Sequence, residues 1–109
     1  MIELRQYRRF PVDLPIEAAG RRGKTVDISA SGIAFESTAR LQPGDSVTVH
    51  IAVPNGGAWR RVRCNARVVR IDRSRRIENG RETMRVAATV QWLGREGEWF
   101  DLVSERRSA

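Results

Sequence analysis

Hydrophobic and polar residues alternate along most of the chain, with the period of two that is typical of half-buried β-strands. The clearest example is residues 46–53, SVTVHIAV, where valine or isoleucine occupies every second position. Residues 61–68 follow the same rule, with arginine or asparagine between the apolar positions. A helical spacing of apolar residues is found only near the C-terminus, over residues 96–107. The pattern therefore predicts a mainly β domain that ends in a short α-helix.

Clusters rich in glycine, proline and asparagine divide the chain into short segments. We expect turns at AAGRRG, QPGD and PNGG, which are residues 18–23, 42–45 and 54–57. The last is the strongest hairpin signal, because asparagine and glycine readily adopt the positive φ angles of tight hairpin turns. The polar stretch RSRRIENGR, residues 73–81, is predicted to be a mobile loop. Five to seven strands at this spacing are typical of a small antiparallel barrel or sandwich.

Two irregularities in the alternation predict local distortions of the sheet. The apolar positions change face after Val68 and continue at Val69 and Ile71. A shift of one residue within a strand indicates a β-bulge, which bends the strand as a barrel requires. Pro15 interrupts the first strand and has no N–H to donate, so we expect that strand at an edge or in irregular pairing.

Length and composition narrow the class of protein. The chain has 109 residues, 40% of them hydrophobic, which suits a single globular domain. No stretch is long and apolar enough to span a membrane, and the N-terminus lacks the apolar core of a signal peptide. The one cysteine, Cys64, cannot form a disulfide framework, so a reducing compartment and a cytoplasmic location are expected.

The net charge of +7 predicts an anionic partner, such as a nucleic acid, a nucleotide or a lipid headgroup. Nineteen of the twenty basic residues are arginine, whose planar fork binds phosphate and guanine edges through two hydrogen bonds at once. A GC-rich genome would also enrich arginine. The positions of the arginines therefore carry more weight than their number.

Groups suited to catalysis are few. His50, the only histidine, occupies a polar position within an apolar strand and lacks the second histidine or cysteine that a metal site needs. Cys64 lies on the apolar face of its strand and is expected in the core. No nucleophile elbow or phosphate-binding P-loop occurs. The sequence favours a binding module over an enzyme, and we expect neither a metal nor a cofactor.

Two short motifs point to a specific ligand. The first is R-Q-Y-R-R, residues 5–9, directly before the first strand, and the second is D-I-S-A-S-G, residues 27–32, directly before the strand IAF. Together they resemble the signature of the PilZ domain, R-x-x-x-R followed by D/N-x-S-x-x-G. PilZ domains are bacterial receptor modules for the second messenger cyclic di-GMP. Either motif alone is weak, but both in this order, with matching strands along nearly the whole chain, are specific. The last strand departs from the family pattern, because residues 86–90 read VAATV where V-G-V-x-F is usual.

The resemblance implies a fold and a ligand site. The fold is a six-stranded antiparallel β-barrel, with a flexible ligand-binding arm over residues 1–9, the barrel over 10–93 and a C-terminal helix over 96–107. The arm is expected to fold over ligand bound on the barrel surface. The implied ligand-binding residues are Arg5, Arg8, Arg9, Asp27, Ser29 and Gly32.

The chemistry of cyclic di-GMP suits these residue types. Arginine forks match phosphates and the O6 and N7 atoms of guanine, and an aspartate accepts hydrogen bonds from guanine N1 and N2. Ser29 is expected to bond phosphate or to hold the loop. Gly32 is expected to adopt a positive φ and to allow close approach of the backbone.

Three interpretations of function remain open. The first is a cyclic di-GMP receptor that acts on an unidentified protein partner, and the second is a ligand-silent PilZ-like adaptor that binds only proteins. The third, a nucleic-acid-binding barrel, has little support, because the seven aromatic residues lie mostly at apolar positions. Arg5, Arg8 and Arg9 can also be interpreted as a solvated tail, and Asp27 and Ser29 as simple turn formers.

The residue before the first motif bears on stoichiometry. Cyclic di-GMP can bind proteins as one molecule or as a stacked pair, and a pair needs additional cations for its phosphates. Here the position is Leu4, which offers nothing to a phosphate or a guanine edge. We therefore expect one cyclic di-GMP per chain, unless Arg8 reaches a second molecule.

Overall fold

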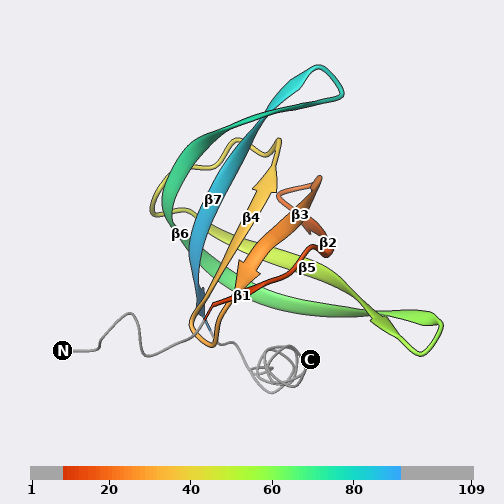
Figure 1. Cartoon of the computed structure of the whole chain (residues 1–109). Coiled ribbons are helices and arrows are strands. Elements are labelled where there is room, and N and C mark those ends of the chain that lie inside the picture. Colours follow the sequence, from red (N-terminus) through yellow and green to blue (C-terminus); the bar gives the residue numbers. More distant parts are fainter. Residues whose placement is uncertain (1–8, 92–109) are drawn as a thin grey trace.

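The computed structural model describes residues 9–91, and every regular element in that range is a β-strand (Figure 1). The strands are β1 (Phe10–Pro11), β2 (Pro15–Ala18), β3 (Arg21–Ile28), β4 (Gly32–Ser37), β5 (Ser46–Asn55), β6 (Ala58–Glu78) and β7 (Arg81–Gln91). Within the described range no helix is long and apolar enough to cross a membrane. The prediction of a mainly β domain is confirmed for these residues.

All paired strands are antiparallel and follow the order β1-β3-β2-β5-β6-β7-β4, with a further pairing of β3 with β4. This last pairing bends the sheet back on itself, so that β2 to β7 form a partial ring (Figure 1). The expected six-stranded closed barrel with a C-terminal helix is therefore corrected. The sheet is a partial ring with β1 as a seventh, two-residue strand. The helix is not seen, and residues 96–107, where it was expected, lie outside the described range.

The ring is irregular where the N-terminal segment crosses β3. Pro11 and Pro15 have no backbone N–H to donate, so the pairing of this segment is interrupted. As a result β1 and β2 pair with separate parts of β3. Between them the buried hydroxyl of Thr25 accepts a hydrogen bond from the Leu14 N–H at 2.8 Å and donates one to the Val12 carbonyl at 2.6 Å. A side chain thus replaces part of the strand ladder. The irregular pairing predicted from Pro15 is confirmed.

The ring encloses one hydrophobic core to which strands β2 to β7 all contribute. The apolar residues at alternate positions of β5 and of the first half of β6 are buried in it, as the alternation predicted. The β-bulge predicted after Val68 is confirmed by a register shift between Val68 and Arg70. Val69, the extra residue, is 53% exposed. The bulge therefore leaves Val69 at the surface and places Ile71 opposite the buried Val86, where it packs against the core.

Three hairpins are closed by two-residue turns in which both residues have positive φ, between 52° and 85°. The turns are Ala19–Gly20, Gly56–Gly57 and Asn79–Gly80. The first two confirm the turns predicted at 18–23 and 54–57. The third corrects the loop expected at 73–81, because β6 and β7 remain paired as far as Glu78 and Arg81. This stretch is polar because it forms a projecting two-stranded ribbon exposed to solvent, and its polarity does not prevent pairing (Figure 1).

Candidate ligand-binding site

The second arginine of the first motif contacts the aspartate of the second motif. Arg9 directly precedes β1, and β1 lies antiparallel to the end of β3, with Pro11 opposite Asp27. The Nη1 atom of Arg9 donates to Oδ1 of Asp27 at 2.6 Å, although the residues are 18 positions apart in sequence. The Arg9 side chain is 57% exposed and the Asp27 side chain 25%. The pair therefore lies at the surface, where a ligand can reach both groups. Arg5 and Arg8 lie outside the described residues.

A β-bulge in β3 sets the direction of Asp27. The register of β3 against β4 shifts between Thr25 and Asp27, so Val26 is an extra residue. Thr25 and Ile28 are both buried, although residues three apart on a regular strand point to opposite faces. The extra residue allows both to face the core and leaves Asp27 on the outer face. This bulge gave no signal in the alternation of hydrophobic residues.

The turn of the second motif is held by its own serine. The Ser29 N–H donates to the Gly32 carbonyl at 3.0 Å, and the Ser31 N–H donates to the Ser29 hydroxyl oxygen at 3.4 Å. The Val90 N–H donates to the Ser31 carbonyl at 2.9 Å, which ties the turn to β7. Ser29 is 2% exposed. Of its two expected roles, the structure supports holding the loop.

Gly32 is needed for space and not for a left-handed backbone. Its φ is not among the positive values in residues 9–91, which corrects that part of the expectation. A Cβ at this position would lie 3.0 Å from the Ala88 carbonyl oxygen on β7 and 3.8 Å from the Ser29 hydroxyl oxygen. The expected close approach of the backbone is therefore present, between β4 and β7.

Small side chains lie next to Asp27 on the outer face of the sheet, where Ala34 is 8% exposed. In the cross-strand register Asp27 lies opposite Ala34 on β4, and Ala34 lies opposite Ala87 on β7. Residues directly opposite each other project on the same face of a sheet. The outer face beside the Arg9–Asp27 pair therefore has two methyl groups where larger side chains would obstruct a planar group. Sequence reasoning missed Ala87, because only the register reveals that it is a neighbour.

A buried carboxylate lies in the next row of the same face. Glu36 on β4 is 6% exposed, and its Oε2 accepts hydrogen bonds from Arg85 Nη2 and from the Ser74 hydroxyl, both at 3.1 Å. Arg76 Nη1 lies 3.3 Å from Oε1. Burial alone would raise the pKa of Glu36. The hydrogen bonds from Arg85 and Ser74 and the charges of Arg85 and Arg76 outweigh that effect and hold the pKa below its usual value.

The other candidate groups have structural surroundings. Cys64 is buried, as predicted, and burial raises the pKa of its thiol to about 12. His50 is half-buried on β5. Within residues 9–91 no three histidine, cysteine, aspartate or glutamate side chains lie close enough together to hold a metal ion.

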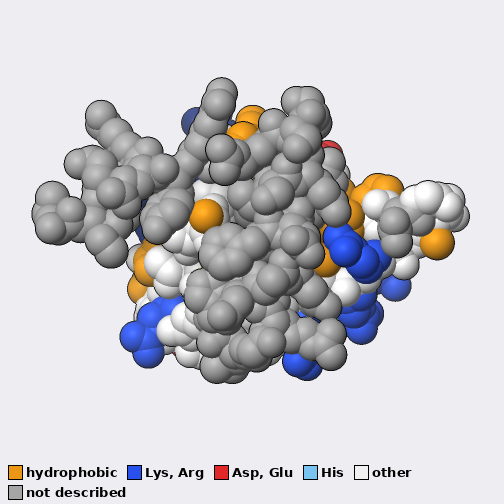
Figure 2. All heavy atoms as spheres, turned by 90° about the horizontal axis from the view of Figure 1, so that it is seen from below, with side chains coloured by type: hydrophobic (Ala, Val, Ile, Leu, Met, Phe, Trp, Pro, Cys, Tyr) orange, Lys and Arg blue, Asp and Glu red, His pale blue; other side chains and the backbone are white. Residues whose placement is uncertain are grey.

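Basic side chains also gather outside the motifs. Figure 2 shows lysine and arginine side chains beside the projecting β5–β6 hairpin. Arg61, Arg63 and Arg67 alternate with core residues along this part of β6 and are exposed. A positive outer surface of this kind attracts anions over a distance but does not by itself form a specific site.

Comparison with known proteins identifies the family. The sequence model of the PilZ domain matches residues 3–94. No curated protein sequence matches the chain. Several solved structures share the fold at low identity.

The inhibitor of motility MotI/DgrA from Bacillus subtilis superimposes with a TM-score of 0.76 and is 23% identical, over 98% of this chain and 51% of that one. This chain thus spans about half the length of MotI. The PilZ domain of YcgR from Escherichia coli, solved with c-di-GMP, has a TM-score of 0.64 and 20% identity, over 97% and 96% of the two chains. The PilZ domain of CeSA from a cellulose-synthesizing bacterium has a TM-score of 0.56 and 24% identity, over 92% and 98%.

At these identities the structural likeness concerns the fold alone. The family match covers both motifs and all seven described strands. This protein therefore belongs to the PilZ domain family.

Proposed function

We propose that this domain is a cyclic di-GMP receptor whose ligand lies on the outer face of β3 and β4, beside Arg9 and Asp27. The observation that carries the proposal is the 2.6 Å contact between these two residues, which joins the two motifs at one place on the surface. Membership of the PilZ family supports it, as does the shared fold with the PilZ domain of YcgR, which was solved with c-di-GMP.

Each residue at the site has a role in this proposal. The contact with Arg9 uses Oδ1 of Asp27, so Oδ2 can accept from the N1 and N2 donors of a guanine. Arg9 uses one terminal nitrogen and can direct its remaining donors to phosphate or to guanine O6 and N7. Ser29 and Gly32 keep the turn close to β7, and the methyl groups of neighbouring strands leave room for a base.

The N-terminal arm would complete the site. Arg5 and Arg8 provide further guanidinium groups for the phosphates, and ordering of the arm over the ligand would change the surface offered to a protein partner. Ordering costs roughly 1 kcal/mol or more of backbone entropy per residue, which the ligand contacts must exceed. Hydrogen exchange at residues 4–10 is expected to slow on addition of cyclic di-GMP. Equal, strong protection with and without ligand would contradict this mechanism.

We expect one cyclic di-GMP per chain. Leu4 lacks the charge that a second, stacked molecule would need, so Leu4→Arg should shift the calorimetric stoichiometry toward two. A stoichiometry near two for the unmodified protein would show that Arg8 compensates. We further propose that the domain acts by binding, without catalysis or a cofactor, in the cytoplasm, where its messenger would be available.

Calorimetry with cyclic di-GMP tests the proposal, with GTP and cyclic di-AMP as controls. Arg5→Ala and Arg9→Ala should each weaken binding by about tenfold or more, as expected for lost charge-assisted hydrogen bonds. Arg63→Ala is the matched control, because it removes an exposed arginine of β6 far from both motifs in sequence. Asp27→Asn should also weaken binding while the melting temperature of the free domain stays near that of the parent.

Three outcomes would overturn all or part of the assignment. Unchanged affinity in both motif arginine variants would remove these residues from the site. Absence of binding to the parent protein would favour the ligand-silent adaptor. A melting temperature for Asp27→Asn far below that of the parent would show that this aspartate is structural.

A further inference from the structure

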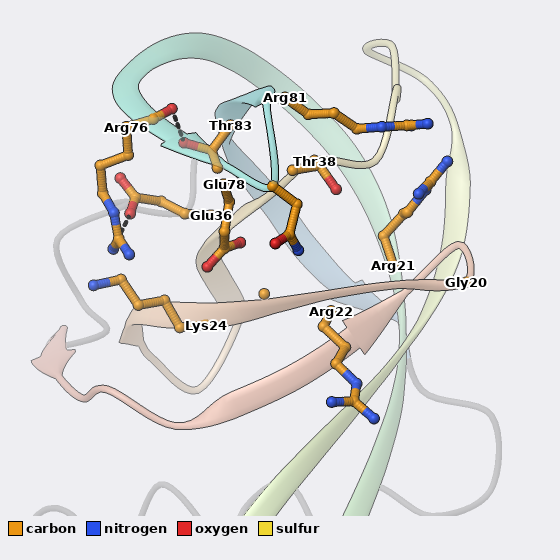
Figure 3. Close-up of a pocket in the computed structure, with 12 residues that line it drawn as sticks. Gly20, Arg21, Arg22, Lys24, Glu36, Thr38, Arg76, Glu78, Arg81 and Thr83 are labelled. Atoms are coloured by element: carbon orange, nitrogen blue, oxygen red, sulfur yellow. Dashed lines mark hydrogen bonds and ion pairs between the residues drawn. The ribbon is translucent and has the colours of Figure 1, made fainter.

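A second basic site lies between two hairpins, away from the Arg9–Asp27 pair. It is a cleft of about 500 Å³ between the β2–β3 hairpin and the tip of the β6–β7 hairpin, with β4 at its floor (Figure 3). Its charged lining residues are Arg21, Arg22, Lys24, Glu36, Arg76, Glu78 and Arg81. Arg21 is six residues before Asp27 on β3, which corresponds to about 20 Å of extended chain. This end of the cleft is therefore remote from the proposed messenger site, and the other end, at Lys24 and Glu36, lies in the row of the sheet next to Asp27 and Ala34.

Positive charge dominates this cleft. Four basic side chains, those of Arg21, Lys24, Arg76 and Arg81, face it against two carboxylates, whereas Arg22 points to the other side of β3 (Figure 3). Figure 3 shows the guanidinium groups of Arg21 and Arg81, which come from different hairpins, extending toward the same side of the cleft. Within residues 9–91 neither of them forms a salt bridge, and neither does Lys24. Cations that converge without a partner produce a local potential that favours an anion.

The floor carboxylate does not oppose such an anion. Glu36 is already paired with Arg76 at 3.3 Å and with Arg85 at 3.1 Å. The carbonyl of Arg76 accepts a hydrogen bond from the Thr83 hydroxyl at 3.0 Å, so both ends of this arginine are held in place. Its remaining guanidinium donors are thereby kept at the cleft. Glu36 thus positions a cation and does not simply neutralise the site.

Tight turns precede the basic residues on both sides of the cleft. Arg21 follows directly after the Ala19–Gly20 turn, and Arg81 follows directly after the Asn79–Gly80 turn. Neutral groups that can donate hydrogen bonds, Thr38 and Asn79, also line the cleft. Several convergent donors, most of them charged, suit the several oxygens of a phosphate group better than a single carboxylate.

We propose that this cleft binds a phosphate-bearing small molecule at a site distinct from the Arg9–Asp27 pair. Two hairpins enclose it, and a concave site of this size suits a small ligand better than a polymer or a membrane surface. The exposed carboxylate of Glu78 can accept a hydrogen bond from a hydroxyl or an amine of the same ligand.

Calorimetric titration of the full chain with inorganic pyrophosphate, at constant ionic strength, tests the proposal. The parent protein should show saturable binding at one site. The double variant R21Q/R81Q should weaken it by about tenfold or more, through loss of two charge-assisted contacts. The control R63Q/R67Q removes two exposed arginines of β6 and should change affinity by less than about twofold, since screened charges contribute little at a distance. Equal losses in both double variants, or no saturable binding by the parent, would overturn the proposal.

A single variant tests the same cleft in case R21Q/R81Q does not fold. Lys24→Gln removes one cation of the cleft without altering a hairpin turn, and it should weaken pyrophosphate binding while the melting temperature is retained. Unchanged pyrophosphate affinity in a folded Lys24→Gln and a folded R21Q/R81Q would overturn the site. Sedimentation with phosphatidylglycerol vesicles distinguishes a lipid headgroup. Vesicle binding that needs Arg21 and Arg81, without pyrophosphate binding, would show a membrane surface instead of a small-molecule site.

Cross-titrations separate this inference from the proposed function. R21Q/R81Q should keep its affinity for cyclic di-GMP within about twofold, and Asp27→Asn should keep its affinity for pyrophosphate, because the two sites share no ligand-binding residue. If R21Q/R81Q lost cyclic di-GMP as Asp27→Asn does, the cleft would be part of the messenger site and the separate site would be refuted. Failure of cyclic di-GMP binding alone would leave the pyrophosphate result intact.

Discussion

Replacement of Glu36 by glutamine removes one buried negative charge from the outer face of the sheet with little change in shape. In the parent protein this carboxylate is 6% exposed and accepts hydrogen bonds from Ser74, Arg76 and Arg85 at 3.1–3.3 Å. Glutamine retains one acceptor oxygen, but its amide nitrogen would face donors. We therefore expect Glu36→Gln to lower the free energy of unfolding.

The size of the effect follows from opposing contributions. A pair of unit charges about 4 Å apart near a protein surface attracts by about 4 kcal/mol, and burial of an ion costs several kcal/mol. Arg76 and Arg85 are each about half exposed, with side-chain exposures of 49% and 52%. In the variant, water can therefore solvate part of both charges, which reduces the loss of stability. The net loss should be about 2 kcal/mol, the value typical of charge-assisted hydrogen bonds. For a domain of this size that corresponds to roughly 10 °C in melting temperature.

The dependence on pH gives an independent reading of the same contact. The folded-state pKa of Glu36 lies below its usual value of 4.5, so its contribution to stability is complete above that pH. The contribution is lost as the pH falls from 4.5 through the folded-state pKa, because over this range the unfolded state takes up the proton before the folded state does. The difference in stability between parent and Glu36→Gln should be constant near about pH 7 and should shrink as the pH falls below 4.5.

Urea denaturation of both proteins across this pH range is the appropriate assay. Glu82→Gln is the matched control, because it makes the same chemical change in an exposed ion pair with Arg73, 3.2 Å apart and with side-chain exposures of 38% and 82%. Glu82→Gln should lower the free energy of unfolding by no more than about 1 kcal/mol, because exposed ion pairs contribute little to stability. A Glu36→Gln protein as stable as the parent near neutral pH would refute this reasoning. It would show that the cost of burying the carboxylate cancels its attraction to Arg76 and Arg85.

Further substitutions test other contacts. Gly23→Ala should destabilise the domain by more than Gly32→Ala in thermal melts, because a Cβ at Gly23 would collide with the Glu36 carbonyl oxygen, whereas at Gly32 the nearest atom, the Ala88 oxygen, is 3.0 Å away. The reverse order would contradict the described strand spacing. Thr25→Val should lower the free energy of unfolding by about 2 kcal/mol, since it leaves the Leu14 N–H and the Val12 carbonyl without their buried partner. An unchanged urea midpoint would refute this bridge. Cys64, buried and with a pKa near 12, should react with a thiol reagent only on unfolding, and fast labelling of the native protein would contradict its burial.

Local features of the chain were readable from the sequence because they depend on neighbouring residues. Alternation predicted the buried face of β5 and β6, and the change of face after Val68 predicted the bulge, because both follow from the two-residue repeat of a strand. Glycines predicted the tight turns that positive φ requires. The motifs at residues 5–9 and 27–32 identified the family, since their residue types and spacing are specific in combination.

Other features depend on which strands become neighbours, and the sequence does not encode that locally. Glu36 meets Arg76 and Arg85 across 40 and 49 residues of chain, and the pairing exists only because β4, β6 and β7 are brought together. The same registers explain why a Cβ at Gly32 would lie only 3.0 Å from the Ala88 carbonyl oxygen and why polar residues 73–81 continue a hairpin. Asp27 faces outward because of a bulge that alternation did not reveal. Cross-strand register is a property of the assembled sheet, since backbone hydrogen bonds join segments regardless of their distance in sequence.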